Sequence, residues 1–115
     1  PDDKVALIEP GSPVAYTTYG ELRAEADAVA RGLLARGLVR GDRVGLIALN
    51  SRALLAAFFG IMRAGLVAVP FSYKAPDEVI AHIARDAALT LVFHDSANAA
   101  RVPEGVPAMM KRASW

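Results

Sequence analysis

Arg43-Val44-Gly45-Leu46-Ile47-Ala48-Leu49, near the middle of the chain, is apolar from its second residue to its last. A strand with one face in water alternates apolar and polar residues, whereas a strand covered on both faces does not. Strands covered on both faces are typically parallel, because crossover connections place helices on either side of the sheet. The stretch therefore predicts a buried parallel strand over 43–49.

Two further apolar segments follow this strand. Leu66–Val69 is the first, and we expect Pro70 to stop it; Thr90–Phe93 is the second. About 20 residues separate one segment from the next, which is enough for a helical crossover between parallel strands. Such crossovers are almost always right-handed. The order predicts a parallel sheet built from strand–helix–strand units.

The first crossover is an apolar helix over 52–64. Asn50 and Ser51 offer two side chains that could cap its start, and Gly65 ends it. We expect this helix to be largely buried, with both phenylalanines in the core, because its large apolar residues cover nearly all of its sides: Leu54, Leu55, Phe58, Phe59, Ile61 and Met62.

The second crossover is a helix that begins near Pro76. Proline fits the first turn of a helix, and Asp77 and Glu78 are favourable at its positive end. Its buried face is predicted to consist of Val79, Ile80, Ile83, Ala84 and Ala87.

The segment before residue 43 predicts a hairpin followed by a helix. Strands over Lys4–Ile8 and Val14–Thr17 flank the turn-forming residues 9–13. Thr18 and Glu21 have the spacing of a capping box, which marks a helix start. The apolar residues that follow recur on one helical face: Leu22, Ala26, Val29, Ala30, Leu33 and Leu34.

Two turns lead from this helix into the 43–49 strand. Gly37 stands where a left-handed residue ends a helix, and Leu38 follows as its hydrophobic partner. Gly41 and Asp42 then form a turn.

The pattern weakens after His94. Residues 97–101 are compatible with one or two helical turns and residues 106–110 with an edge strand. We predict an α/β fold with a mainly parallel β-sheet flanked by helices and preceded by an N-terminal β-hairpin, all in the single segment 1–115.

Composition excludes several classes of protein. The chain has 115 residues, of which 54% are hydrophobic, and this fraction argues against disorder. Its net charge of +1 argues against a nucleic-acid partner. It has no cysteine, hence no disulfide and no thiolate site, and this suits the cytoplasm. The longest apolar run, Ala53–Met62, spans about 15 Å as a helix, half of a bilayer core. The acidic residues 1–3 lack the apolar core of a signal peptide, and without an initiating Met we expect a piece of a longer protein.

Few side chains suggest chemistry. His82 is expected on an exposed helix side, whereas His94 follows a strand end, where α/β folds place ligands. Its neighbour Asp95 does not complete a metal cluster. Lys74 and Arg101 also follow strand ends, where a phosphate could approach, although solvated loop charges explain them more simply. No phosphate loop, GxSxG, HExxH or CxxC motif is present.

An ordered series of short motifs over about residues 4–95 resembles the opening of AMP-forming acyl-CoA synthetases, the AMP-dependent synthetase and ligase family that includes luciferases and the adenylation domains of peptide synthetases. The motifs are Tyr19-Gly20-Glu21-Leu22, Ala30 with Leu33-Leu34, Gly37-Leu38-Val39-Arg40-Gly41-Asp42-Arg43-Val44, Leu49-Asn50-Ser51, Phe59-Gly60, Arg63-Ala64-Gly65, Val69-Pro70, Pro76 with Glu78, and Leu91-Val92-Phe93.

The resemblance implies a parent enzyme that activates a small carboxylic acid, such as a fatty or aryl acid, in two steps. ATP with Mg²⁺ gives an acyl-adenylate and pyrophosphate, and a thiol, usually that of coenzyme A, then displaces AMP. The family's Ser/Thr/Gly-rich phosphate loop and late catalytic Lys have no counterpart in this sequence. No catalytic residue and no metal ligand can therefore be assigned, the cofactor-binding residues are unknown, and we expect residues 1–115 to be inactive alone.

The matched residues have scaffold roles under this resemblance. Asp42 would form the turn before the 43–49 strand and Asn50 would cap the buried helix, while Gly65 and Pro70 bracket a strand. The expected partner is the remainder of the enzyme, and strands apolar on both faces predict exposed surface and self-association in isolation.

Two alternatives stay open. The parent could be a carrier-protein adenylation domain in place of a coenzyme A ligase. The chain could also be a stand-alone binding or regulatory module, although a receiver-like module would need acidic residues at its strand ends, where this sequence has Asn50, Pro70 and His94.

Overall fold

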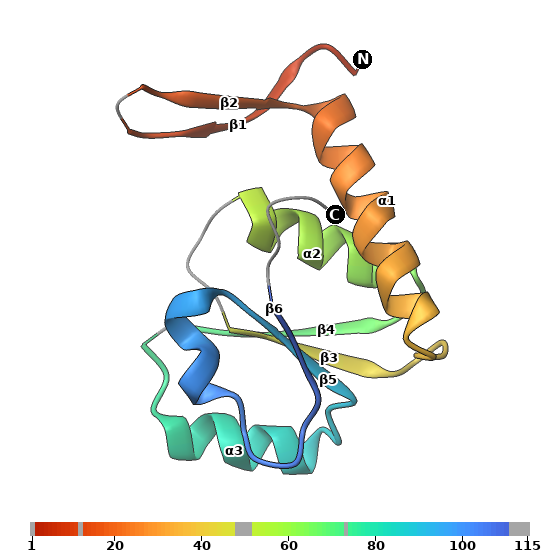
Figure 1. The fold of residues 1–115 in the computed structure, drawn as a ribbon, viewed down its shortest axis with the longest axis vertical. Helices are drawn as coiled ribbons and strands as arrows, with labels where there is room; N and C mark the ends of the chain where they lie inside the picture. The colour runs from red at the N-terminus through yellow and green to blue at the C-terminus, as the bar shows by residue number, and fades with distance from the viewer. Residues whose placement is uncertain (1, 12, 48–51, 73, 111–115) are drawn as a thin grey trace.

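The structure is a computed structural model, and it describes residues 2–11, 13–47, 52–72 and 74–110. Its central sheet has four parallel strands in the order β4-β3-β5-β6 (Figure 1). These are β3 (Arg43–Ile47), β4 (Val67–Phe71), β5 (Leu91–His94) and β6 (Ala108–Met110). A separate antiparallel hairpin precedes them, formed by β1 (Val5–Glu9) and β2 (Ala15–Thr18). The predicted fold class is confirmed.

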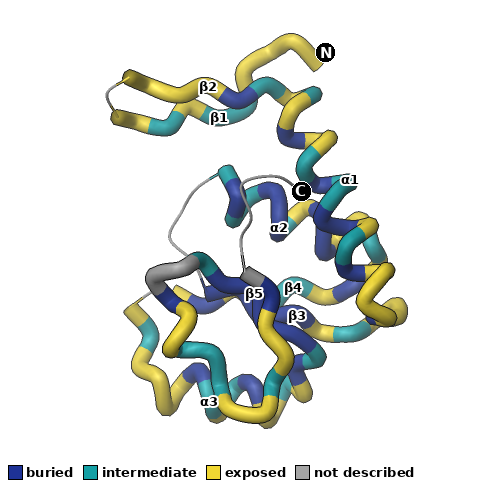
Figure 2. Tube along the Cα trace, in the orientation of Figure 1, coloured by how far each residue is buried: buried dark blue, intermediate teal, exposed yellow. Residues whose placement is uncertain are grey.

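Helices lie on both faces of the sheet. Helices α1 (Tyr19–Ala35) and α2 (Arg52–Arg63) cover one face, and α3 (Asp77–Asp86) covers the other (Figure 1). Each face has its own core, and both are buried from solvent (Figure 2). The α1–α2 core contains Val29, Leu33, Leu38, Val44, Leu46, Ala57, Ile61, Leu66, Leu91, Phe93 and Met109. The α3 core contains Ile47, Phe71, Ile80, Ala84, Leu89 and Val92.

The start and end of α1 follow the sequence signals. The hydroxyl of Thr18 accepts a hydrogen bond from the Glu21 amide at 3.1 Å, and the Glu21 carboxylate accepts one from the Thr18 amide at 2.9 Å. This reciprocal pair is the predicted capping box. Gly37 has φ +92° and Leu38 is buried, as expected of a left-handed helix end with a hydrophobic partner.

The capping box makes part of the stability depend on pH. The hydrogen bond from the Thr18 amide, helped by the Thr18 hydroxyl, holds the pKa of Glu21 below its ordinary value. A lowered pKa stabilises the fold above the unfolded-state pKa, and this contribution is lost as pH falls through the folded-state pKa. We expect Glu21→Gln to lower the free energy of unfolding at pH 7 and to have little effect in acid, and Thr18→Ala to cost about 1 kcal/mol.

Urea unfolding at both pH values measures this effect. Glu104→Gln, in an exposed loop, is the matched control and should change little. A Glu21→Gln effect that is equal at the two pH values would show that the carboxylate does not act through its charge.

Strand β4 corrects one prediction. Pro70 does not stop it, because the strand continues to Phe71 with Pro70 opposite Leu46. Among the described strands β4 lies at the edge of the sheet, and proline is tolerated at an edge because no strand pairs with that side of it. The edge position also leaves Val67 exposed.

Helix α2 corrects a second prediction, because it is not buried all round. Phe59 and Met62 are 40% and 46% exposed, and Phe58 is half-buried. The buried residues are mostly small: Ala53, Ala56, Ala57, Gly60 and Ile61. The physical reason is the close approach of α1. A Cβ on Gly60 would lie 2.7 Å from Cβ of Val29, which leaves no room for a ring between the helices.

Hydrogen bonds and ion pairs of charged side chains connect α2 with β1 and α1. The Glu9 carboxylate, at the end of β1, accepts a hydrogen bond from the Arg52 amide at 3.2 Å and so satisfies a free donor at the start of α2. Arg52 also forms an ion pair with Glu25 of α1, and Arg63 forms one with Asp27 at 2.5 Å. The predicted caps Asn50 and Ser51 lie outside the described residues, as do Ala48 and Leu49 of the predicted 43–49 strand.

The turn before β3 has its predicted structure. The Asp42 carboxylate accepts a hydrogen bond from the Val39 amide at 2.9 Å, and the Asp42 carbonyl accepts one from the Val67 amide at 2.9 Å. Gly65 ends α2 with φ +80°. The scaffold roles predicted for Asp42 and Gly65 are thus confirmed. Among the described residues, no helix is long and apolar enough to cross a membrane.

Candidate functional site

The sheet has one topological switch point, at the carboxyl ends of β3 and β5. From β3 the chain moves through α2 to β4 on one side, and then crosses through α3 to β5 on the other side. Because the two crossovers run in opposite directions, their helices lie on opposite faces (Figure 1). Open α/β sheets bind ligands in the crevice at such a point. His94, the last residue of β5, lies here in register with Ile47.

His94 is buried, with 6% of its surface exposed. Its Nδ1 lies 2.8 Å from the Asp95 carbonyl oxygen. A carbonyl oxygen only accepts hydrogen bonds, so Nδ1–H of His94 donates this one. Along β5, Phe93 belongs to the α1–α2 core, so alternation places His94 on the α3 side of the sheet. Among the residues that the structure describes, no nucleophile or second acid–base side chain is hydrogen-bonded to His94.

A polar chain joins the end of β5 to the start of α3. The Asp95 carboxylate accepts hydrogen bonds from the amide and side chain of Asn98, at 3.1 and 2.6 Å. The side-chain Oδ1 of Asn98 accepts one from Arg101 at 3.1 Å, and Arg101 also donates to the Asp77 carboxylate at 2.9 Å and to the backbone carbonyl of Ala75. Asp95 and Arg101 bracket the 3₁₀ helix η1 (Ser96–Arg101), within the region where one or two helical turns were expected.

Arg101 is therefore not a solvated loop charge. Its side chain is only 19% exposed, and its guanidinium joins η1 to the first turn of α3. Lys74, in contrast, is exposed in the loop after β4, as the simpler explanation of a solvated loop charge predicted. His82 is exposed on α3, as expected, 3.0 Å from Asp86. The structure thus brings Arg101 and Asp77 together and leaves His82 apart from them.

These residues do not fit the ATP and Mg²⁺ that the family resemblance implies. The described parts of the chain contain no group of three His, Asp or Glu residues that could hold a metal ion. The guanidinium at the carboxyl edge is occupied by internal oxygens, and a phosphate would have to displace them. We therefore assign no chemical step to residues of this edge.

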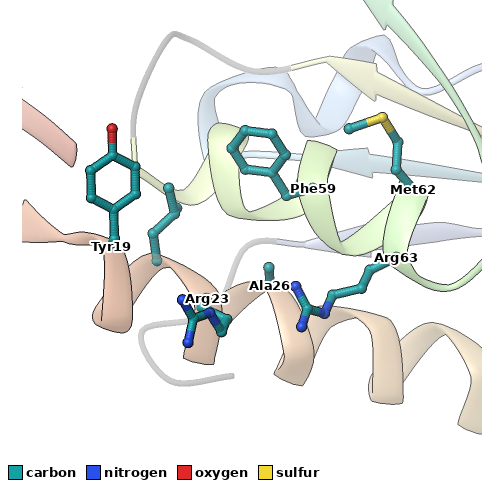
Figure 3. A pocket seen from close by; sticks show the side chains of 7 residues that line it. Tyr19, Arg23, Ala26, Phe59, Met62 and Arg63 are labelled. Atoms are coloured by element: carbon teal, nitrogen blue, oxygen red, sulfur yellow. The ribbon is translucent and has the colours of Figure 1, made fainter. Parts of the chain in front are cut away.

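A hollow lies between α1 and α2, on the side turned away from the sheet. Its volume is about 460 Å³. Figure 3 shows its lining side chains from close by. Seven residues line it: Tyr19, Leu22, Arg23 and Ala26 from α1, and Phe59, Met62 and Arg63 from α2. We call it the α1–α2 groove. Sequence reasoning missed it because Phe59 was expected in the core.

Comparison with known proteins decides the family. The family model described as "AMP-binding enzyme" matches residues 1–113, which is nearly the whole chain. The chain belongs to the AMP-binding enzyme family. The motif series that suggested this family is thereby confirmed.

The proteins that this chain resembles are much longer than it is. It is 39% identical over 93 residues to coprinoferrin synthetase of Coprinopsis cinerea, covering 81% of this chain and 4% of that protein. It is 34% identical over 104 residues to the acyl-CoA ligase SID4 of Ajellomyces capsulatus, covering 84% and 18%. The N-terminal subdomain of Klebsiella oxytoca NpsA superposes with a TM-score of 0.82 at 28% identity, covering 94% of this chain and 27% of that one.

Proposed function

We propose that residues 1–115 are the first part of the large N-terminal domain of an AMP-forming carboxylic acid–coenzyme A ligase. The match to the AMP-binding enzyme family over residues 1–113 supports this most strongly. The chain would supply a folded scaffold, since Arg101 is used internally and no phosphate loop is present in the sequence. The phosphate loop, the catalytic Lys and the C-terminal domain would belong to the remainder of the enzyme.

The acceptor thiol and the substrate are finer parts of the proposal. Coenzyme A as acceptor is supported by the likeness to the acyl-CoA ligase SID4. Likeness to surfactin synthase subunit 2 of Bacillus subtilis, at 39% over 75 residues, supports a carrier-protein adenylation domain as the second candidate. In both cases the substrate would be a small carboxylic acid activated with ATP and Mg²⁺, and we place the enzyme in the cytoplasm.

A chimeric ligase tests the scaffold role. We expect SID4 whose matching 104-residue segment is replaced by the aligned part of this chain to retain ATP–pyrophosphate exchange within about tenfold, because a change of tenfold corresponds to only about 1.4 kcal/mol of altered positioning. The measurement is exchange driven by the acid that unmodified SID4 activates.

The control is the same chimera carrying Phe93→Ala, which should lose folded protein and exchange together. A soluble, folded chimera with exchange at background would refute the scaffold role. Thioester formation by the active chimera with coenzyme A, compared with a carrier protein, then distinguishes the two acceptors.

A further inference from the structure

The α1–α2 groove combines an apolar surface with two cations. Tyr19, Phe59 and Met62 contribute apolar surface while remaining about half exposed. The side chains of Arg23 and Arg63 enter from the two helices and are 51% and 53% exposed (Figure 3). Small-molecule sites typically have this composition, an apolar lining with a few polar groups, and volumes of roughly 300–1,000 Å³.

The two arginines differ in how many of their guanidinium nitrogens contact a carboxylate. Arg23 holds Asp2 through both of its Nη groups, at 3.0 and 2.5 Å. Arg63 contacts Asp27 through Nε, and the described residues give its Nη groups no hydrogen-bond partner. Exposed ion pairs contribute little free energy, so Asp27 competes weakly for this guanidinium. Arg63 is therefore the cation that can receive an anion.

We propose that the α1–α2 groove binds a small amphiphilic carboxylate, with the carboxylate on Arg63 and the alkyl or aryl body against Phe59 and Met62. Guanidinium groups bind carboxylates by paired, charge-assisted hydrogen bonds. Methionine adapts its shape to irregular apolar ligands. The groove lies on α1 and α2, apart from the carboxyl edge of the sheet, so this binding does not depend on the proposed enzyme function.

Two other occupants compete with this proposal. A second copy of the chain could cover the exposed apolar residues, and so could a helix of another protein. The size of the groove favours a small ligand, because a helix laid across two helices needs an elongated groove that accepts several of its turns. The cation at the edge of the apolar surface favours an acid over a neutral hydrocarbon.

Methionine-methyl NMR of the 115-residue chain tests the proposal. Octanoate is titrated while the methyl signal of Met62 is followed, with the buried Met109 as internal reference. We expect a saturable shift of Met62 alone, and binding of the neutral octan-1-ol to be about threefold weaker because the contact between its head group and the exposed Arg63 is no longer an ion pair.

Matched variants locate the contacts. Arg63→Gln should weaken octanoate binding about threefold and Phe59→Ala should also weaken it, whereas Arg31→Gln, on an exposed part of α1, should not. Phe59 and Arg63 are exposed enough for both variants to stay folded. Equal binding of octanoate and octan-1-ol, equal binding by Arg63→Gln, or no saturable shift would overturn the proposal. A Met62 signal that moves with protein concentration alone would overturn it in favour of a second copy.

Discussion

Phe93→Ala is expected to lower the free energy of unfolding by about 3–5 kcal/mol. Phe93 lies in the middle of the sheet and is 1% exposed. Its ring belongs to the core between β5, α1 and α2, beside Leu46 of the neighbouring strand β3. Removing the ring loses its transfer free energy and leaves a cavity that a parallel sheet held by strands on both sides cannot close. Urea unfolding followed by circular dichroism measures the loss.

The matched control is Phe59→Ala, the same substitution at a ring that is 40% exposed. It should cost clearly less, about 1–2 kcal/mol, since a large part of the ring is already in water and its removal leaves no closed cavity. The all-round burial of α2 predicted from sequence required a large cost at Phe59 as well. Equal losses for Phe93→Ala and Phe59→Ala would contradict the packing described for α2.

Gly60→Ala is expected to destabilise the fold by about 1–3 kcal/mol, although alanine is the better helix former. The added Cβ would lie 2.7 Å from Cβ and Cγ1 of Val29 and 2.8 Å from the Ala26 carbonyl oxygen. Contacts this short force α1 and α2 apart, and backbone is among the atoms that would have to move. Thermal unfolding of the purified variant is the measurement.

Gly32→Ala provides the control, because Gly32 is also inside a helix. Its added Cβ would meet only the end of the Met109 side chain, at an ordinary 3.6 Å. We expect this variant to be neutral or stabilised by up to about 1 kcal/mol, from helix propensity alone. If Gly60→Ala behaved like Gly32→Ala, the close helix crossing would be absent.

Local signals in the sequence predicted most of the fold. The apolar run from Val44 identified a strand covered on both faces, and the Thr18–Glu21 spacing identified the start of α1. Gly37 and Gly65 were predicted to end helices, and both have the positive φ that favours glycine at a helix end. Each of these signals depends on neighbouring residues only, so tertiary contacts did not override it.

Tertiary contacts explain what the sequence did not predict. Pro70 is tolerated because β4 is an edge strand, and strand order is a property of the whole sheet. Phe59 is exposed because α1 crosses α2 at Gly60. Hydrophobicity alone assigned every large residue of α2 to the core, whereas the structure selects the small ones for the tightest contact.

The two candidate sites were predictable to different degrees. His94 was expected at a ligand-binding edge because it follows a strand, and the switch point between β3 and β5 confirms its place. The role of Arg101 depends on Asp77, 24 residues away, and no sequence spacing indicates that pair. The α1–α2 groove likewise combines residues such as Arg23 and Arg63, which only the helix crossing brings together.

ATP–pyrophosphate exchange by the purified 115-residue chain tests the central claim, that these residues form scaffold without a reaction centre. The protein is first shown to be folded by its circular dichroism and then incubated with ATP, Mg²⁺, labelled pyrophosphate and a panel of fatty and aryl acids. We predict exchange at background for every acid, because no phosphate loop is present and Arg101 is bound internally. Exchange above background that disappears in Phe93→Ala would contradict the claim and show that residues 1–115 contain an adenylation site of their own.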